Sequence, residues 1–141
     1  FSPAKKPAET AVFEQDPVRH VLIPVGLGKV ERKQDTMGML DTGAALTVVS
    51  LDYALARPEY FEPVKEMSNG FDSHGNPLKS VLLITTLFVG RKKFVAEYVM
   101  AIDFTAIQKM TGEKVNFILG HNILKHGTWY LDFPNRRWAV E

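Results

Sequence analysis

The sequence predicts a small all-β domain, built as a closed barrel or a sandwich, with a few short helices. Short β-branched and apolar runs recur along the chain, and clusters of strong turn formers separate them. The segments with helical character are only one or two turns long. With 141 residues, 45% of them hydrophobic, the chain fits a single domain with a packed core.

The predicted strands follow one another from residue 20 onward. The first is the apolar run HVLIPVGLG, which ends at two glycines, and a second strand follows a tight turn at Gly28-Lys29. A long hairpin turns at His74-Gly75-Asn76-Pro77, and later turns are expected at Gly90-Arg91 and Pro134-Asn135. The expected strand segments are 20–28, 30–40, 46–50, 68–89 (a hairpin whose second arm begins near 79), 93–102, 117–119, 128–133 and 137–140.

Three segments between the strands have helical character. Ser50 is placed to cap a helix over 51–57, which Pro58 would stop. Single helical turns are expected at 105–110 and 122–125. The first 18 residues contain three prolines and little apolar periodicity. We expect a flexible tail or linker over 1–18 before a domain over 19–141, or alternatively an edge strand along the domain surface.

The composition excludes several kinds of chemistry. The chain has no cysteine, which removes thiolate catalysis and a disulfide framework. Its 17 basic and 16 acidic residues leave a net charge of +1, without the basic surplus of a nucleic-acid-binding domain. The longest apolar stretch, 81–90, is far shorter than the roughly 20 residues that span a membrane. The four histidines, His20, His74, His121 and His126, form no HExxH pattern, so we expect no metal site.

The most informative stretch runs from Gly38 to Ser50 and reads GMLDTGAALTVVS. An apolar strand delivers Asp41 to a turn of small residues, and a second apolar strand leaves it. A carboxylate buried there would cost several kcal/mol unless other groups satisfied it. Gly43 can offer a backbone N–H at close range, and Thr42 can offer a hydroxyl group. The Asp-Thr-Gly tripeptide taken alone is also compatible with an ordinary β-turn.

The extended pattern resembles the active-site strand and loop of the retropepsin-like aspartic proteases, a family of retroviral proteases and single-lobed cellular and bacterial relatives. The later run VNFILGHNIL, residues 115–124, resembles the apolar-apolar-Gly element that crosses beneath that loop in the family and leads into a short helix. The hairpin at 68–89 lies where the family has its flap. The resemblance covers about residues 20–140 and implies a retropepsin-like acid-protease half-barrel with one or two short helices.

The resemblance also implies an activity, that of an aspartic-type endopeptidase acting on polypeptides without a cofactor. Asp41, Thr42 and Gly43 would be the catalytic residues. The chain contains one Asp-Thr-Gly, so the second carboxylate must come from a second copy in a homodimer, and the two would share one proton. The positions expected to contact the substrate are Ala44, Ala45, Gly70, Ser73, His74 and Gly75.

Two positions depart from the viral pattern. Ala45 stands where viral members often have an aspartate, and His121 stands where they often have an arginine. In those proteins the two side chains are neighbours in an ionic network near the dimer interface, so their joint loss suggests a different interface. The C-terminal run 137–141 could join a sheet shared between subunits. The alternative function is a catalytically silent retropepsin fold that dimerises or binds peptides.

Overall fold

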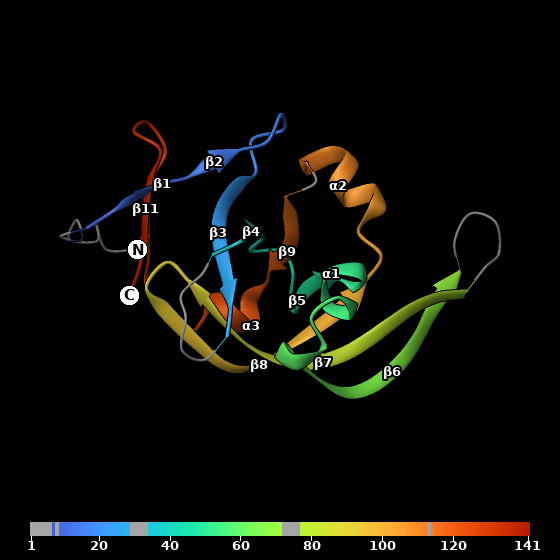
Figure 1. The fold of residues 1–141 in the computed structure, drawn as a ribbon. Coiled ribbons are helices and arrows are strands. Elements are labelled where there is room, and N and C mark those ends of the chain that lie inside the picture. The colour runs from blue at the N-terminus through green and yellow to red at the C-terminus, as the bar shows by residue number, and fades with distance from the viewer. Residues whose placement is uncertain (1–6, 8, 29–33, 72–76, 113) are drawn as a thin grey trace.

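The computed structural model describes residues 7, 9–28, 34–71, 77–112 and 114–141 (Figure 1). Its strands alternate with short helices and tight turns, as the sequence predicts. The strands of the larger sheet are β2 (Glu14–Gln15), β3 (Val21–Leu27), β4 (Thr36–Leu40), β5 (Thr47–Ser50), β6 (Phe61–Phe71), β7 (Pro77–Val89), β8 (Lys92–Ile102) and β9 (Val115–Leu119).

These strands form one sheet in the order β2-β3-β4-β9-β5-β8-β7-β6. An additional antiparallel pairing of β3 with β7, through Val25↔Val89 and Leu27↔Leu87, closes the sheet on itself. The closed part is therefore a barrel of β3, β4, β9, β5, β8 and β7, and the all-β prediction is confirmed. β6 and β7 continue together beyond the barrel as a long hairpin, on the right of Figure 1.

The helices are short and lie between strands. They are α1 (Leu51–Leu55), the 3-10 turn η1 (Pro58–Tyr60), α2 (Thr105–Thr111) and α3 (His121–Leu124). The Ser50 hydroxyl accepts a hydrogen bond from the backbone N–H of Tyr53, as expected for the cap of α1. All three segments in which the sequence indicated a helical turn are helical. Among the described residues, no helix is long and apolar enough to cross a membrane.

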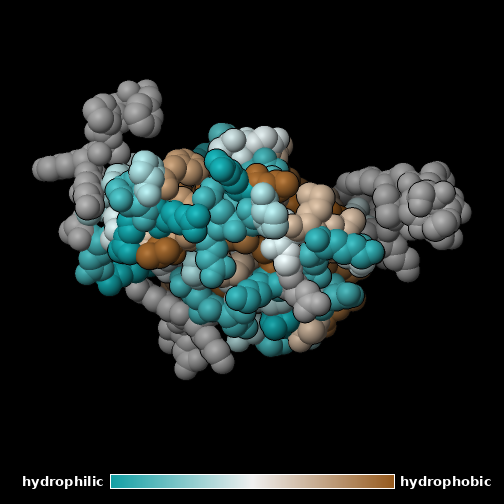
Figure 2. Space-filling model, turned by 90° about the horizontal axis from the view of Figure 1, so that it is seen from above, coloured by the Kyte–Doolittle hydropathy of each residue, from teal (hydrophilic) through white to brown (hydrophobic). Residues whose placement is uncertain are grey.

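The barrel interior is filled by one large apolar cluster. Its fully buried members come from strands far apart in the chain and include Ile23, Val49, Leu87, Val99 and Phe117. A smaller cluster lies under α2 and consists of Leu22, Met39, Phe104, Val115 and Ile118. On the face shown in Figure 2, apolar side chains form small separate groups among polar ones. Val49 of β5 and Phe117 of β9 both belong to the large cluster, so the core holds the strand that leaves the Asp41 loop and the strand beneath it.

A second, three-stranded sheet contains both ends of the described chain. β11 (Arg137–Val140) pairs with β10 (Trp129–Asp132) on one edge and with β1 (Ala11–Val12) on the other (Figure 1). β1 and β2 are each at the edge of a sheet, so residues 11–15 match the edge-strand alternative, and Phe13 between them is only 1% exposed. Arg137 and Trp138 are paired on both sides within the chain. A second copy could extend this sheet beside β1 or β10, or beside Ala139 and Val140, which among the described residues pair with β10 alone.

The main difference from the sequence-based expectation is the length of β6. The strand begins at Phe61, although the sequence indicated strand structure only from residue 68. The first part of β6 was not predicted because it contains polar residues and Pro63, and a proline cannot donate a hydrogen bond to a sheet ladder. β6 lies at an edge of the sheet, where a missing donor is tolerated. The second predicted strand is shorter than expected, and β4 begins at Thr36, while residues 29–33 lie outside the described part.

Candidate active site

Asp41 lies in the loop that joins β4 to β5, directly after the last residue of β4. Its side chain is half-buried, while Thr42 and Gly43 are exposed. The backbone N–H of Gly43 donates a hydrogen bond to Asp41 Oδ1 at 3.0 Å. The backbone of Asp41 is also fixed, since its N–H donates to Leu119 O at 3.1 Å and its carbonyl accepts from Ala44 N at 3.2 Å. The loop therefore holds the carboxylate in place and leaves it accessible.

β9 passes between the two strands that flank this loop. It runs parallel to β4, with Met39 opposite Ile118, and antiparallel to β5, with Val49 opposite Phe117. β9 ends at Leu119, and Gly120 then lies against the loop itself. A Cβ atom on Gly120 would be 2.6 Å from the backbone carbon of Leu46, closer than such atoms approach. Only glycine fits here, which explains why the apolar-apolar-Gly run ends in this residue.

Thr47 and Asn122 lock the loop to the segment after β9. The Thr47 hydroxyl, which is fully buried, accepts from the backbone N–H of Gly120 at 2.9 Å and donates to Asn122 Oδ1 at 2.9 Å. Asn122 Oδ1 also accepts from the backbone N–H of Thr47 at 2.8 Å, and its amide group donates to Tyr98 O at 2.9 Å. The Thr47 hydroxyl is buried and the side chain of Asn122 is half-buried, and both have partners, so the network is stabilising. Sequence reasoning gave neither residue a role, although Thr47 lies within the stretch GMLDTGAALTVVS.

α3 continues this support through backbone contacts. The N–H of His121 donates to Ala44 O at 2.7 Å, and the N–H of Asn122 donates to Ala45 O at 3.3 Å. These two hydrogen bonds join the segment 44–45 to the segment 121–122. Ala45 and His121, the two positions that depart from the viral pattern, therefore lie in neighbouring segments. The side chain of His121 is exposed.

The expected substrate-contacting positions are divided between two places. Ala44 and Ala45 lie in the Asp41 loop, where Ala45 is exposed and Ala44 half-buried. Gly70 belongs to β6, in the long hairpin. Ser73, His74 and Gly75 lie outside the described residues, between the end of β6 and the start of β7. Their proposed role stays a prediction.

Comparison with known proteins bears on the fold. No protein-family model and no curated protein matches the chain. Among solved structures, the chain is similar to the crystal structure of a retropepsin-like aspartic protease from Rickettsia conorii, with a TM-score of 0.54. The match covers 94% of this chain and 89% of that one, at 14% sequence identity. The chain has the retropepsin-like fold. The position of β9 beneath the Asp41 loop agrees with the element order that the resemblance implied.

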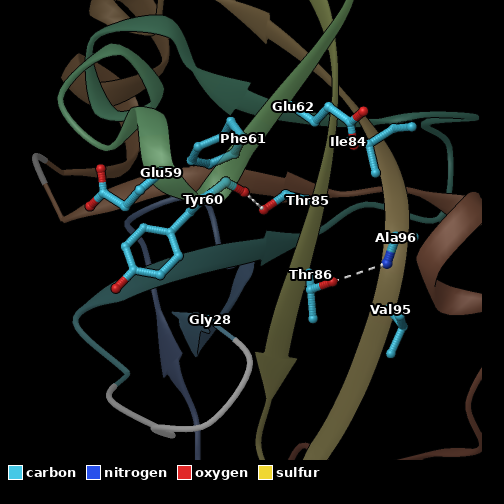
Figure 3. A pocket seen from close by; sticks show the side chains of 10 residues that line it. All are labelled: Gly28, Glu59, Tyr60, Phe61, Glu62, Ile84, Thr85, Thr86, Val95 and Ala96. Atoms are coloured by element: carbon cyan, nitrogen blue, oxygen red, sulfur yellow. Dashed lines mark hydrogen bonds between the residues drawn. The ribbon is translucent and has the colours of Figure 1, made fainter.

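The structure also contains a pocket that sequence reasoning missed. It has a volume of about 600 Å³ and is lined by Gly28, η1, the start of β6 and the middle of β7 and β8 (Figure 3). Thr85 Oγ1 donates to Tyr60 O at 2.7 Å, and Thr86 Oγ1 accepts from the N–H of Ala96 at 3.1 Å. Ala96 has a positive φ of 53° at a β-bulge. The lining comes from four distant segments, which is why no local sequence signal marks it.

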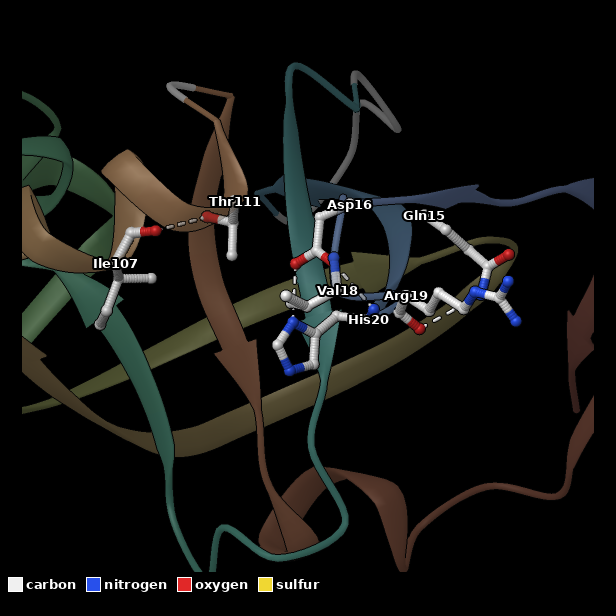
Figure 4. Close-up of polar contacts among 7 residues, drawn as sticks. All are labelled: Gln15, Asp16, Val18, Arg19, His20, Ile107 and Thr111. Atoms are coloured by element: carbon white, nitrogen blue, oxygen red, sulfur yellow. Dashed lines mark hydrogen bonds and ion pairs between the residues drawn. The ribbon is translucent and has the colours of Figure 1, made fainter.

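A buried carboxylate lies in the turn before β3. Asp16 accepts hydrogen bonds from the backbone N–H groups of Val18 and His20 through Oδ1, and its Oδ2 lies 2.7 Å from His20 Nδ1 (Figure 4). Burial raises the pKa of Asp16, but the hydrogen bonds and charge of His20 outweigh it and hold the pKa below its usual value. Arg19, with a φ of 68°, completes this tight turn. The arrangement is that of a structural turn.

Among the described residues, no group of three or more His, Asp or Glu side chains is arranged to hold a metal ion. Two other aspartates, Asp35 and Asp103, have local roles. Asp103 accepts from the backbone N–H and the hydroxyl of Thr105 at the start of α2, which lowers its pKa. Asp35 accepts from the Tyr53 hydroxyl at 3.1 Å. Asp41, by contrast, is half-buried in a loop whose backbone is hydrogen-bonded to β9.

Proposed function

We propose that this chain is an aspartic-type endopeptidase that cleaves polypeptides and in which Asp41 is the catalytic carboxylate. The observation that carries the proposal is the Asp41 loop itself. One carboxylate oxygen is held by the N–H of Gly43, and the loop is locked by Gly120 and by the buried Thr47 hydroxyl. Such rigid support around an accessible carboxylate is what a catalytic acid or base requires. The retropepsin-like fold, seen also in the similar structure, supports the same assignment.

The chemistry needs two carboxyl groups that share one proton. The ionised group takes a proton from a water molecule as its oxygen attacks the carbonyl carbon of the peptide bond. The protonated group gives its proton to the carbonyl oxygen. When the tetrahedral intermediate collapses, the group that took the water proton gives it to the leaving amine, a hydroxyl of the intermediate returns a proton to the other carboxylate, and the C–N bond breaks. The products are a free carboxyl group and a free amine, and no cofactor takes part.

One chain supplies only one Asp-Thr-Gly, so we propose that the active unit is a homodimer with a twofold axis between the two copies of Asp41. The exposed state of Thr42 and Gly43 supports this, because these residues would face the second copy. Thr42 would contact its counterpart, and the backbone of Gly43 would face the substrate. A single chain would therefore supply only one of the two catalytic carboxyl groups.

The long β6–β7 hairpin is proposed to cover the substrate. Gly70 lies in its first arm, and Ser73, His74 and Gly75 lie towards its tip in sequence. Ala44 and Ala45 would contact the substrate from the opposite side. A hairpin of this length that projects from the barrel can open to admit a chain and close to exclude water. Slower amide hydrogen exchange over 68–82 when a statine-type transition-state analogue binds would support this role.

The experiment that tests the activity compares the Asp41→Asn variant with the unchanged chain on a peptide library at mildly acidic pH. We expect cleavage by the unchanged chain and none by the variant, since an amide cannot act as the base. Asp52→Asn is the matched control, because Asp52 is an exposed carboxylate in the first turn of α1. Equal cleavage by the Asp41→Asn variant would exclude Asp41 as the catalytic residue. A folded dimer that binds peptides but cleaves none would favour the catalytically silent module.

A further inference from the structure

The charged residues that line a groove beside the Asp41 loop are mostly positive. It has a volume of about 660 Å³ and is lined by residues 92–98 of β8, by Leu46, and by Asn122, Lys125 and His126 of α3 and the segment after it. The lining contains three lysines and one glutamate, which leaves a surplus of two positive charges when His126 is neutral. The whole chain has a net charge of only +1. Positive charge is therefore concentrated here.

One end of the groove adjoins the end of the Asp41 loop and α3. Leu46 is the last residue of the Asp41 loop, and Asn122 is hydrogen-bonded to Thr47 and to Tyr98 O. From Tyr98 the groove follows β8 back to Lys92. At about 3.3 Å per residue, these strand positions span roughly 20 Å. An extended chain that leaves Asp41 in this direction could lie along the groove for about six residues.

The charged groups in the groove face one another. His126 Nε2 lies 3.6 Å from Glu97 Oε1, and the Glu97 side chain is 14% exposed. Burial raises the pKa of Glu97, while the positive charges of His126 and Lys125 act against this rise. One partly buried acid thus lies close to both His126 and Lys125 at this end of the groove. Further along, Lys92 lies over the ring of Phe94.

The charge on the opposite side of the β8 bulge is negative. The pocket of Figure 3 shares Val95 and Ala96 with the groove, but its charged lining residues are Glu59 and Glu62. A peptide segment with acidic side chains would be attracted to the groove and repelled from that pocket. The sign of the charge therefore favours the groove over the pocket on the other side of the bulge.

We propose that this groove binds acidic side chains of the polypeptide substrate several residues away from the bond that is cut. The inference rests on the proposed function, because it takes Asp41 as the point of cleavage. It adds a substrate class, namely polypeptides with a flanking acidic segment, and assigns Lys125, His126, Lys92 and Lys93 as specificity-determining residues. Exposed ion pairs of this kind are worth up to about fivefold each in binding.

The test uses pairs of otherwise identical peptides that carry glutamate or glutamine at each position from three to eight residues on either side of the cleavage site. The unchanged chain should cleave the glutamate peptide with a several-fold higher kcat/KM on one side of the site. Lys125→Gln combined with Lys92→Gln should reduce this ratio to near one. Lys125→Glu should lower it further and favour a lysine peptide. Lys109→Gln is the matched control, because Lys109 is an exposed lysine on α2 outside the groove.

Fluorescence anisotropy with the same labelled peptides, measured on the Asp41→Asn chain, separates this inference from the proposed activity. Selective binding of the glutamate peptide that the lysine variants abolish would support the groove even if no peptide is cleaved. Equal binding of the glutamate and glutamine peptides at every position would overturn the inference, whether or not Asp41 proves catalytic. An identical effect of Lys109→Gln would also overturn it, since the cause would then be the overall charge of the chain. Thermal unfolding of each variant checks that the fold is retained.

Discussion

The buried hydroxyl of Thr47 accepts a hydrogen bond at 2.9 Å from the backbone N–H of Gly120, 73 residues further along the chain. This contact joins the strand that leaves the Asp41 loop to the residue that directly follows β9. Because Asp41 N–H also donates to Leu119 O, the loop is fixed to β9 on both of its sides. The position of the carboxylate is thus determined by long-range pairing.

Thr47→Val is expected to lower the free energy of unfolding by about 1–3 kcal/mol, because the buried N–H of Gly120 loses its acceptor. Thr47→Ser keeps the hydroxyl and loses one methyl group, at about 1 kcal/mol. Chemical denaturation of both variants measures the two effects. If the serine variant proves the less stable, the threonine contributes by packing, and the hydrogen bond is of minor importance.

Gly120→Ala is expected to displace the Asp41 loop from β9. The added Cβ would meet backbone atoms of Leu46 and Ala44 at 2.6–2.9 Å, and a backbone cannot turn aside as a side chain can. We expect a loss of about 2–3 kcal/mol in stability and the loss of peptidase activity. In the control Gly38→Ala, the nearest atom is a side-chain methyl group of Val25 at 2.8 Å. Retained activity in the Gly120→Ala chain would show that the close approach has no role in holding Asp41.

The parts of the site that could be predicted from the sequence are those formed by residues close together in the chain. The apolar run into Asp41, the small residues after it and the cap at Ser50 all lie within 13 consecutive residues, and the structure forms the loop, β5 and α1 there. The groove and the pocket of Figure 3 gather residues from distant segments, so no periodicity or spacing marks them. Asn122 was missed for the same reason. Thr47 lies within the 13-residue stretch, but its role depends on contacts with Gly120 and Asn122, which are distant in sequence. The beginning of β6 was missed because Pro63 is tolerated there only at a sheet edge.

Asp16 is expected to make stability depend on pH in the acidic range. Its pKa is lower in the folded chain than in the unfolded one, so its contribution is present above about pH 4. That contribution is lost as the pH falls through the folded-state pKa. Asp16→Asn should therefore be less stable than the unchanged chain at pH 7, by about 1–2 kcal/mol for a charge-assisted contact, and the difference should shrink below pH 4.

Glu14→Gln is the control for this measurement, because Glu14 is an exposed acid of the neighbouring strand β2. Denaturation midpoints between pH 2 and pH 7 give the comparison. A difference between Asp16→Asn and the unchanged chain that stays constant down to pH 2 would mean that the shape of the turn, and not the charge on Asp16, is what stabilises it.

The dimer mechanism is tested most directly by mixing active chains with an excess of Asp41→Asn chains and measuring peptidase activity per active chain. If the two catalytic carboxylates come from two subunits, mixed dimers carry only one of them, and activity per active chain should fall towards zero as the excess grows. Adding the same excess of Asp52→Asn chains, which retain Asp41, should not lower it. Activity per active chain that stays constant across the whole range of mixing and dilution would show that each chain is complete alone, and would contradict the account.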